Sequence, residues 1–579
     1  HDDRKQVTSG TIPEVLQIVQ SPGVLAACNQ LVGENWAIVP FMHNASFLSG
    51  SNDQAWHKDD NAPYNGRKHR HHQPVQIEML YYPQAVAEDM GPTALVPYSH
   101  YWTFNHEENS DNFAGADHLD FDYQLNGMES QPVSGKNSKY STEDILNRNT
   151  PHDKRMRDAI TDLNWPLAKQ FETAPLKPGS VVFVSHNTFH RGNHRRDDWR
   201  TWPENPRFMW RFWLYRTTDP GGGAPKPFRR PGIDNLTGID LSDASDDVTE
   251  VWRSHYYWMN NVLPAPARPG AAALTTDQRQ QEADRLSGQL LLKNDESEPL
   301  RIGAAYKLAS IGDDQMAADG LGKALHNERE TVRRAALYGL SALGPAATDV
   351  LIDAAGSAAK WVRRAAVAAL GDAALLDERV CATVENCLLN DASVYVRSVA
   401  AGSLGCLIRR AFARQEGAEL IPRSMEALCS SLEQEENRPT MDRVQGRSIK
   451  MVRPTDECDV CEGEPARFHH ERLEPVRSAV RENVLWSMVI ICSHGSTVLG
   501  PSLEPCITAL RTVILEDPNG ISVGYAMDAL NRLAHLHADD ESPPILALRK
   551  QWPDLLQDAP GISHESLIRG GLESSEMSP

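Results

Sequence analysis

The stretch Gly179-Ser180-Val181-Val182-Phe183-Val184-Ser185-His186-Asn187-Thr188-Phe189-His190 is an apolar, β-branched run that ends in a turn with two histidines. A short run of this kind, bounded by turn residues, predicts a buried strand. Similar runs at residues 35–41, 75–82, 91–97 and 207–216 predict further strands, separated by turns that contain Gly and Pro. Several short strands joined in this way are typical of a β-sandwich or jelly roll.

A second stretch, Trp56-His57-Lys58-Asp59, carries a histidine and an aspartate two residues apart. Side chains at this spacing on an extended segment point to the same side, so both can reach one metal ion. His190 offers a third ligand from the first stretch, and His186 is its alternative. Two histidines and one carboxylate that leave positions open form the ligand set of non-haem Fe(II) oxygenases.

Four stretches carry a family resemblance by their order and local context: His57-Lys58-Asp59, Gly91 to His100, Pro178 to Gly192, and Arg207-Phe208-Met209. With them, residues 15–260 resemble the phytanoyl-CoA dioxygenase family of Fe(II)/2-oxoglutarate oxygenases. The resemblance implies a double-stranded β-helix (a jelly-roll, cupin-like fold) that holds Fe(II) on His57, Asp59 and His190. It also implies 2-oxoglutarate and O2 as co-substrates, with release of succinate and CO2.

The distal carboxylate of 2-oxoglutarate needs a buried cation, and a guanidinium binds a carboxylate through two parallel charge-assisted hydrogen bonds. In the family this arginine lies on the strand after the distal histidine. Arg207 lies 17 residues after His190, so we expect an inserted hairpin at Asp197 to Pro206. Arg211, on the same face of the strand, is the alternative. Two further residues fall where family members place side chains near the co-substrate, Asn44 and Gln76.

The carboxylate of Asp59 bears on the type of reaction. Related halogenases have a small residue at this ligand position, so that chloride binds the iron. A carboxylate here favours hydroxylation of a small organic substrate. Two alternatives are a protein hydroxylase that recruits a polypeptide through the C-terminal half, and a non-catalytic binding scaffold.

The C-terminal half contains internal repeats. Leu300-Arg301, Val332-Arg333, Val362-Arg363 and Val396-Arg397 each begin an Ala- and Leu-rich helical segment, and the last three pairs are 30 and 34 residues apart. Val476-Arg477 is assigned as the next pair, after an insertion. Helix pairs at this period predict an α-solenoid of five or six HEAT-like repeats. The recurring arginines have two interpretations: hydrogen bonds between helices, or a concave surface that binds a partner or closes over the oxygenase.

A chain of 579 residues is too long for one core, so we expect two domains. The predicted parts are 1–262 (oxygenase, with insertion 101–175 as the lid or substrate region), 263–280 (linker), 281–555 (HEAT-like, with insertion 430–475) and 556–579 (tail).

The composition excludes some classes of partner. The net charge of −20, from 78 acidic and 58 basic residues, argues against nucleic acid or an anionic membrane surface. No apolar run reaches the roughly 18 to 20 residues that span a bilayer. Most of the nine cysteines stand singly in apolar helical patterns, which predicts reduced, buried thiols and a cytoplasmic location.

Cys458 and Cys461, followed by His469 and His470, raise the question of a zinc site in the 430–475 insertion. A single pair of this spacing is a weak signal. The alternative is two free cysteines in a loop.

Overall fold

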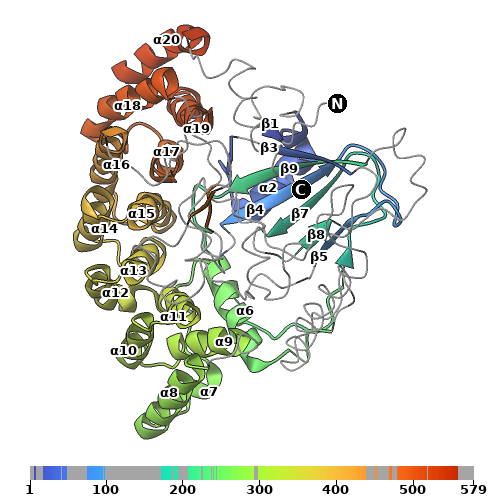
Figure 1. Ribbon diagram of the computed structural model, residues 1–579, viewed down its shortest axis with the longest axis vertical. Coiled ribbons are helices and arrows are strands. Elements are labelled where there is room, and N and C mark those ends of the chain that lie inside the picture. The colour runs from blue at the N-terminus through green and yellow to red at the C-terminus, as the bar shows by residue number, and fades with distance from the viewer. Residues whose placement is uncertain are drawn as a thin grey trace.

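The structure is a computed structural model. It describes residues 6–7, 17–40, 42–47, 73, 75–95, 97, 171–185, 188, 190–192, 207–222, 226–235, 238, 240–242, 244–292, 298–437, 450–452, 469–471, 479–517 and 520–558. β-Sheets from the N-terminal part lie inside the arc of a helical solenoid formed by the C-terminal part (Figure 1).

Two antiparallel sheets form the N-terminal part as far as the structure describes it. The larger has the strand order β1-β3-β9-β4-β7 with β2 beside β9, and the smaller has the order β6-β5-β8. Each predicted strand stretch contains an observed strand. The bounds are β1 Gln6–Val7, α2 Pro22–Val32, β2 Ala37–Ile38, β3 Met42–Phe47, β4 Gln76–Tyr82, β5 Thr93–Leu95, β6 Phe171–Glu172, β7 Ser180–Ser185, β8 His190–Gly192 and β9 Arg207–Tyr215.

Strand β9 has two different faces because its side chains alternate. Phe212 and Leu214 pack on one side in a cluster that contains apolar residues of α2. Arg207, Met209 and Arg211 occupy the other face. On that face, the Thr93 hydroxyl of β5 lies 3.8 Å from the Met209 sulfur, so this side of the larger sheet faces the smaller sheet.

The solenoid consists of two rows of helices, and its inner row faces the sheets (Figure 1). The outer row is α8 Thr276–Leu290, α10 Asp314–Leu325, α12 Thr348–Ala355, α14 Glu378–Asn390, α16 Leu420–Asn437, α18 Leu503–Glu516 and α20 Pro543–Asp558. The inner row is α9 Glu298–Ala309, α11 Glu330–Leu343, α13 Lys360–Ala373, α15 Val394–Arg414, α17 Ala479–Cys492 and α19 Gly520–Asn531. The described residues therefore contain six stacked pairs, α8/α9 to α18/α19.

Small residues allow the inner helices to approach closely. A Cβ added at Gly405 of α15 would lie 2.8 Å from the Cβ of Ser487 in α17, too close for any other residue at this position without a shift. Outer helices begin at side-chain caps: Thr275 and Gln278 form a capping box on α8, and Asp313 and Asp377 cap α10 and α14.

The recurring arginines form a ladder between helices, which confirms the first of their two interpretations. Arg397 donates to the carbonyl oxygens of Asp391 (3.0 Å) and Ala392 (3.1 Å) at the end of α14, and to the carboxylate of Glu435 (2.7 Å) on α16. The other arginines also donate to carbonyl oxygens just after the preceding outer helix: Arg301, Arg333 and Arg363.

The assignment of the fifth pair to Val476-Arg477 is wrong by four residues. Helix α17 begins at Ala479, and Arg481 makes the ladder contacts, to the Leu432 carbonyl at 2.9 Å and to the carboxylate of Asp517 at 2.6 Å. The equivalent pair is therefore Val480-Arg481. Two Val-Arg pairs occur in succession here, and only the position of the helix distinguishes them.

The expected linker 263–280 is corrected by the structure. It contains α7 (Pro269–Ala272) and the start of α8. The amide of Arg268 donates to the carbonyl of Ser310 (3.1 Å), and its guanidinium pairs with Glu282 at 2.6 Å. The preceding helix α6 (Asp246–Met259) packs on α9, where Lys307 pairs with Asp247 at 3.0 Å. This segment is part of the packed solenoid.

The concave side of the solenoid is occupied by the chain's own N-terminal part. Arg409 of α15 pairs with Asp219, which follows β9. Arg532, after α19, donates to the carbonyl oxygens of Asn35 (2.8 Å) and Trp36 (3.2 Å). One apolar cluster includes residues of β2 and β9 together with residues of both rows of helices.

Two further expectations concern cysteines and apolar segments. The described cysteines are buried free thiols: Cys28, Cys381, Cys387, Cys406, Cys429, Cys492 and Cys506. One described stretch, Val332–Ala355, has the length and hydropathy of a membrane span. It comprises α11, a 3-10 turn at Gly344–Ala347 and α12, and most of it is buried against neighbouring helices.

Candidate functional site

His190 opens strand β8 and is buried, with 4% of its surface exposed. Its Nδ1 lies 3.1 Å from the carbonyl oxygen of Thr188. A carbonyl only accepts hydrogen bonds, so Nδ1 carries the proton and the lone pair of the neutral ring is on Nε2. Metal-binding histidines usually show this arrangement, because the second hydrogen bond fixes the ring and its tautomer.

Arg207 and Arg211 share the inner face of β9 and differ in their surroundings. Arg211 pairs with the buried carboxylate of Glu78, with 3.5 Å between Nε and Oε1. Arg207 is fully buried at the start of the strand. A keto-acid carboxylate would have to compete with Glu78 for Arg211, which argues against this alternative, and the role of Arg207 stays a prediction.

The contact between Thr93 and Met209 places His190 and Arg207 in one space between the sheets. His190 is directly opposite Leu95 in the β5/β8 pairing, so its side chain shares a face with Leu95 and Thr93. Arg207 shares a face with Met209, two residues on. His190 therefore lies about 7 Å from Thr93 in the smaller sheet, and Arg207 lies about 7 Å from Met209 in the larger sheet.

Tyr82 belongs to the same space and was not identified from the sequence. It is fully buried, and its hydroxyl lies 2.8 Å from the Thr93 hydroxyl. Burial raises the pKa of the Tyr82 phenol, and the positive charge of Arg207 opposes this rise. The period of two along residues 76–82 would have placed Tyr82 on the inner face, but its contact with β5 is not visible in the sequence.

Comparison with protein-family models gives two matches. The phytanoyl-CoA dioxygenase (PhyH) family model matches residues 3–201, and the HEAT repeat model matches residues 288–371 and 321–405. The chain joins a phytanoyl-CoA dioxygenase region to HEAT repeats. The predicted resemblance is thereby confirmed. No curated protein matches the chain.

The two family matches differ in which parts of the chain they cover. The phytanoyl-CoA dioxygenase match includes the positions of His57, Asp59 and His190, and it ends six residues before Arg207. The match supports an enzyme of the Fe(II)/2-oxoglutarate oxygenase type and implies a cupin-like fold. The HEAT match ends within α15, whereas the structure continues the helix pairs to Asn531 and adds the helix α20, which ends at Asp558.

The other two co-substrate candidates do not gather around Arg207. Gln76 pairs with Tyr215, at the far end of β9. Eight residues along a strand span about 26 Å, so Gln76 and Arg207 cannot contact the same five-carbon keto acid. The position of Asn44 is opposite Trp210, on the face of the larger sheet away from Arg207.

Several predicted residues lie outside the described part of the chain: His57, Asp59, His186, the 101–170 part of the insertion, and the zinc candidates Cys458 and Cys461. His469 and His470 lie on strand β11 (His469–Glu471), which pairs with β10 (Lys450–Val452). No cluster of three or more metal-binding side chains occurs among the residues that the structure describes, and of the predicted iron ligands these include only His190.

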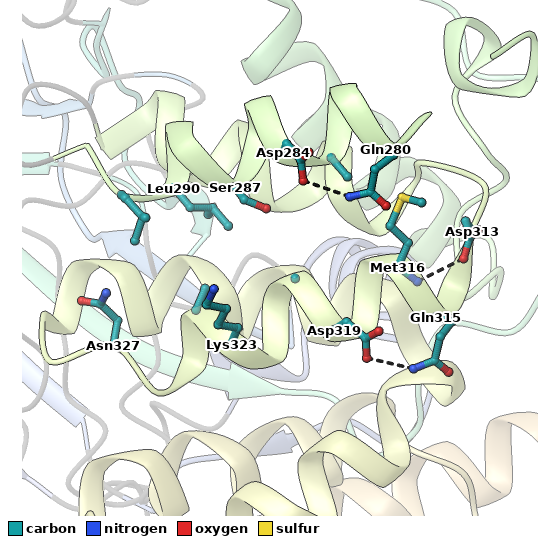
Figure 2. A pocket seen from close by; sticks show the side chains of 14 residues that line it. Gln280, Asp284, Ser287, Leu290, Asp313, Gln315, Met316, Asp319, Lys323 and Asn327 are labelled. Atoms are coloured by element: carbon teal, nitrogen blue, oxygen red, sulfur yellow. Dashed lines mark hydrogen bonds between the residues drawn. The ribbon is translucent and has the colours of Figure 1, made fainter. Parts of the chain in front are cut away.

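A separate groove of about 690 Å³ lies on the outer row of the solenoid, between α8 and α10 (Figure 2). Two pairs of its polar side chains bond within their own helices: Gln280 donates to Asp284 at 2.9 Å and Gln315 to Asp319 at 2.8 Å. The groove lies on the side of the solenoid away from the sheets (Figure 1).

Proposed function

We propose that this protein is a non-haem Fe(II)- and 2-oxoglutarate-dependent dioxygenase that hydroxylates a small organic substrate. His57 and Asp59, with His190, would hold the iron, and Arg207 would hold the distal carboxylate of 2-oxoglutarate. The chemistry that ferrous iron supplies when bound is oxidative decarboxylation of 2-oxoglutarate to succinate and CO2, coupled to hydroxylation of a substrate C–H bond. We also propose that the two sheets form the family's double-stranded β-helix.

The tautomer of His190 carries this proposal. The carbonyl of Thr188 keeps the proton on Nδ1, so Nε2 carries the lone pair and could bind a metal ion without losing a proton. A buried guanidinium such as Arg207 binds a carboxylate more strongly than an exposed one, because neither group is then screened by water. The donor set fits a ferrous ion and a keto acid.

A small substrate is favoured because the concave face of the solenoid is already covered. Asp219 pairs there with Arg409, and the loop at Asn35 is held by Arg532. A protein hydroxylase that recruited its substrate on this face would first have to displace the oxygenase region. A protein partner, which HEAT repeats often bind, is instead expected on the outer row.

The test is formation of succinate from 2-oxoglutarate in the presence of Fe(II) and O2. We expect His190→Ala to abolish succinate formation. It should also weaken Fe(II) binding by at least about 10- to 100-fold, because this much is lost even when only a residue that hydrogen-bonds to a metal ligand is removed. Arg207→Gln should raise the concentration of 2-oxoglutarate needed for half-maximal succinate formation. Arg379→Gln, on the exposed outer surface of α14, is the control. Equal succinate formation by wild type and His190→Ala would refute the proposal.

A further inference from the structure

The groove of about 690 Å³ between the outer helices α8 and α10, the α8/α10 groove, has an apolar base (Figure 2). Ala283, Leu290 and Ala324 are buried there. Met316 is half-buried, and Leu291, at the end of α8, keeps 49% of its surface exposed. Clefts that hold a ligand usually have volumes of about 300 to 1,000 Å³ and mostly apolar walls. The groove can therefore accommodate side chains of a bound molecule.

The charged groups along this groove are mainly acidic. Asp284 of α8 and Asp319 of α10 are exposed, and each accepts a hydrogen bond from a glutamine of its own helix, at 2.9 and 2.8 Å. An amide has no net charge, so both carboxylates keep theirs. Asp313 adds a third carboxylate at the N-cap of α10. Lys323 is the one cation among the described lining residues, so the groove favours a cationic ligand.

Arginines connect neighbouring outer helices at two other places in this row. Arg379 of α14 pairs with Asp349 of α12 at 2.9 Å. Arg423 of α16 pairs with Glu385 of α14 at 2.6 Å. In both cases a guanidinium from one outer helix neutralises a carboxylate of the preceding outer helix. Of the described residues that line the α8/α10 groove, none is an arginine.

The sequence of α10 shows which residue stands in place of the bridging arginine. Asp313 caps α10 as Asp377 caps α14, and the second residue after the cap is Gln315 in α10 and Arg379 in α14. Gln315 donates to Asp319 of its own helix at 2.8 Å. As far as the described residues show, the acidic sides of this groove therefore lack the guanidinium that the chain itself supplies elsewhere in the row.

We propose that the α8/α10 groove is a docking site for a segment of a partner protein in which an arginine stands next to an aliphatic residue. The guanidinium pairs with Asp284 and Asp319, one on each helix, because its planar fork can bind two carboxylates. The aliphatic side chain covers the apolar base. The inference does not depend on the proposed iron chemistry, since the groove lies on the side of the solenoid away from the sheets (Figure 1).

The experiment selects the ligand without assuming its sequence. Random 12-residue peptides displayed on phage are selected on the full-length protein, and the enriched peptides are synthesised and titrated by calorimetry. We expect the enriched peptides to share an arginine beside an aliphatic residue. The double variant Asp284→Asn/Asp319→Asn should weaken their binding about 5-fold or more, since two ion pairs are lost. Asparagine keeps an oxygen that accepts from the glutamine, so the helices are preserved.

Asp353→Asn/Glu426→Gln is the matched control. It removes the same charge from exposed positions on α12 and α16, outside the groove, and should leave the affinity unchanged. Equal losses in the two double variants would show attraction to the overall negative charge and would overturn the inference. Selection of no peptide, or of peptides without arginine, would also overturn it.

A variant that adds charge tests the same site in the opposite way. Gln315→Arg places a guanidinium on α10 at the position that Arg379 has on α14, next to Asp319. We expect it to weaken binding of the selected peptides, because an internal cation then competes with the arginine of the peptide. An unchanged affinity would contradict the proposed pairing. Urea unfolding of this variant should show a stability at least equal to that of wild type.

Discussion

At the scale of single residues, Arg207 and Arg211 are four positions apart on one face of β9 and have different environments. Glu78 already faces Arg211, so that guanidinium serves a pair within the fold. Breaking a buried pair leaves a charge in a place from which water is excluded, and this costs more than the pair itself contributes. The stability of the sheet therefore depends on Arg211, and co-substrate binding is expected to depend on Arg207.

Arg211→Gln should lower the free energy of unfolding by about 3 kcal/mol, because it leaves the carboxylate of Glu78 buried without its guanidinium partner. The double variant Arg211→Gln/Glu78→Gln should recover part of that loss. Urea unfolding of both variants measures the effect. A single variant as stable as wild type would show that the pair contributes nothing.

At the scale of elements, three of the ladder arginines each connect three parts of the solenoid: the arginine's own inner helix, the end of the preceding outer helix and a carboxylate further along. These are Arg363, Arg397 and Arg481. Arg397 illustrates this with two carbonyl oxygens after α14 and the carboxylate of Glu435 on α16. The planar guanidinium can serve all of these acceptors at once, whereas an ammonium cannot. This geometry explains why the position is arginine in every repeat that the sequence reveals.

Arg397→Lys should destabilise the protein by about 2 to 3 kcal/mol, since Glu435 is buried and several acceptors lose their donors. Arg379→Lys is a matched control: Arg379 also pairs with two carboxylates, Asp349 and Asp377, but is largely exposed. The control should leave stability almost unchanged, because water screens this exposed group. Thermal unfolding of both proteins distinguishes them, and equal melting temperatures would contradict the ladder argument.

At the scale of the whole molecule, the solenoid contacts the end of strand β9. Tyr215, at the end of β9, lies 5.5 Å from the ring of Trp486 on α17. His494, just after α17, stacks on Phe412. Its Nε2 lies 3.1 Å from the carbonyl oxygen of Thr217. The strand that begins at Arg207 thus ends against the inner helices, so the solenoid supports the position of the candidate site.

This interface makes stability depend on pH. Burial is the main cause that lowers the pKa of His494 to about 4. The nearby His537 and Arg532 contribute in the same direction, and the hydrogen bond with the Thr217 carbonyl opposes them. The unfolded chain binds this proton at higher pH than the folded one, so the stabilisation is present above about pH 6.5 and is lost as the pH falls toward 4. We expect the free energy of unfolding to fall by about 2 kcal/mol from about pH 7 to about pH 5 on this account.

His494→Gln keeps a donor for the Thr217 carbonyl and removes the titrating group, so it should abolish that part of the pH dependence. The control is His326→Gln at an exposed position after α10, which should retain the wild-type dependence. Urea unfolding at the two pH values measures both. An identical fall in wild type and His494→Gln would refute this account.

The sequence alone determined the local parts of this protein. Alternating and β-branched runs predicted where the strands lie, and the recurring Val-Arg pairs predicted the solenoid, because both are periodic patterns within one element. The iron and co-substrate candidates His190 and Arg207 were predicted from their positions beside recognisable strands and from the family resemblance, and their roles stay predictions. The assignment of Val476-Arg477 failed because two such pairs follow each other and the helix start decides between them.

Only the tertiary structure decided which of these parts meet. It joined Tyr82 to Thr93, gave Glu78 to Arg211, put Gln76 about 26 Å from Arg207, and filled the concave face of the solenoid with the chain's own sheets. These contacts join residues on different elements, in some cases hundreds of positions apart. They depend on strand pairing and helix packing in space, and no pattern within a single element encodes such a pairing.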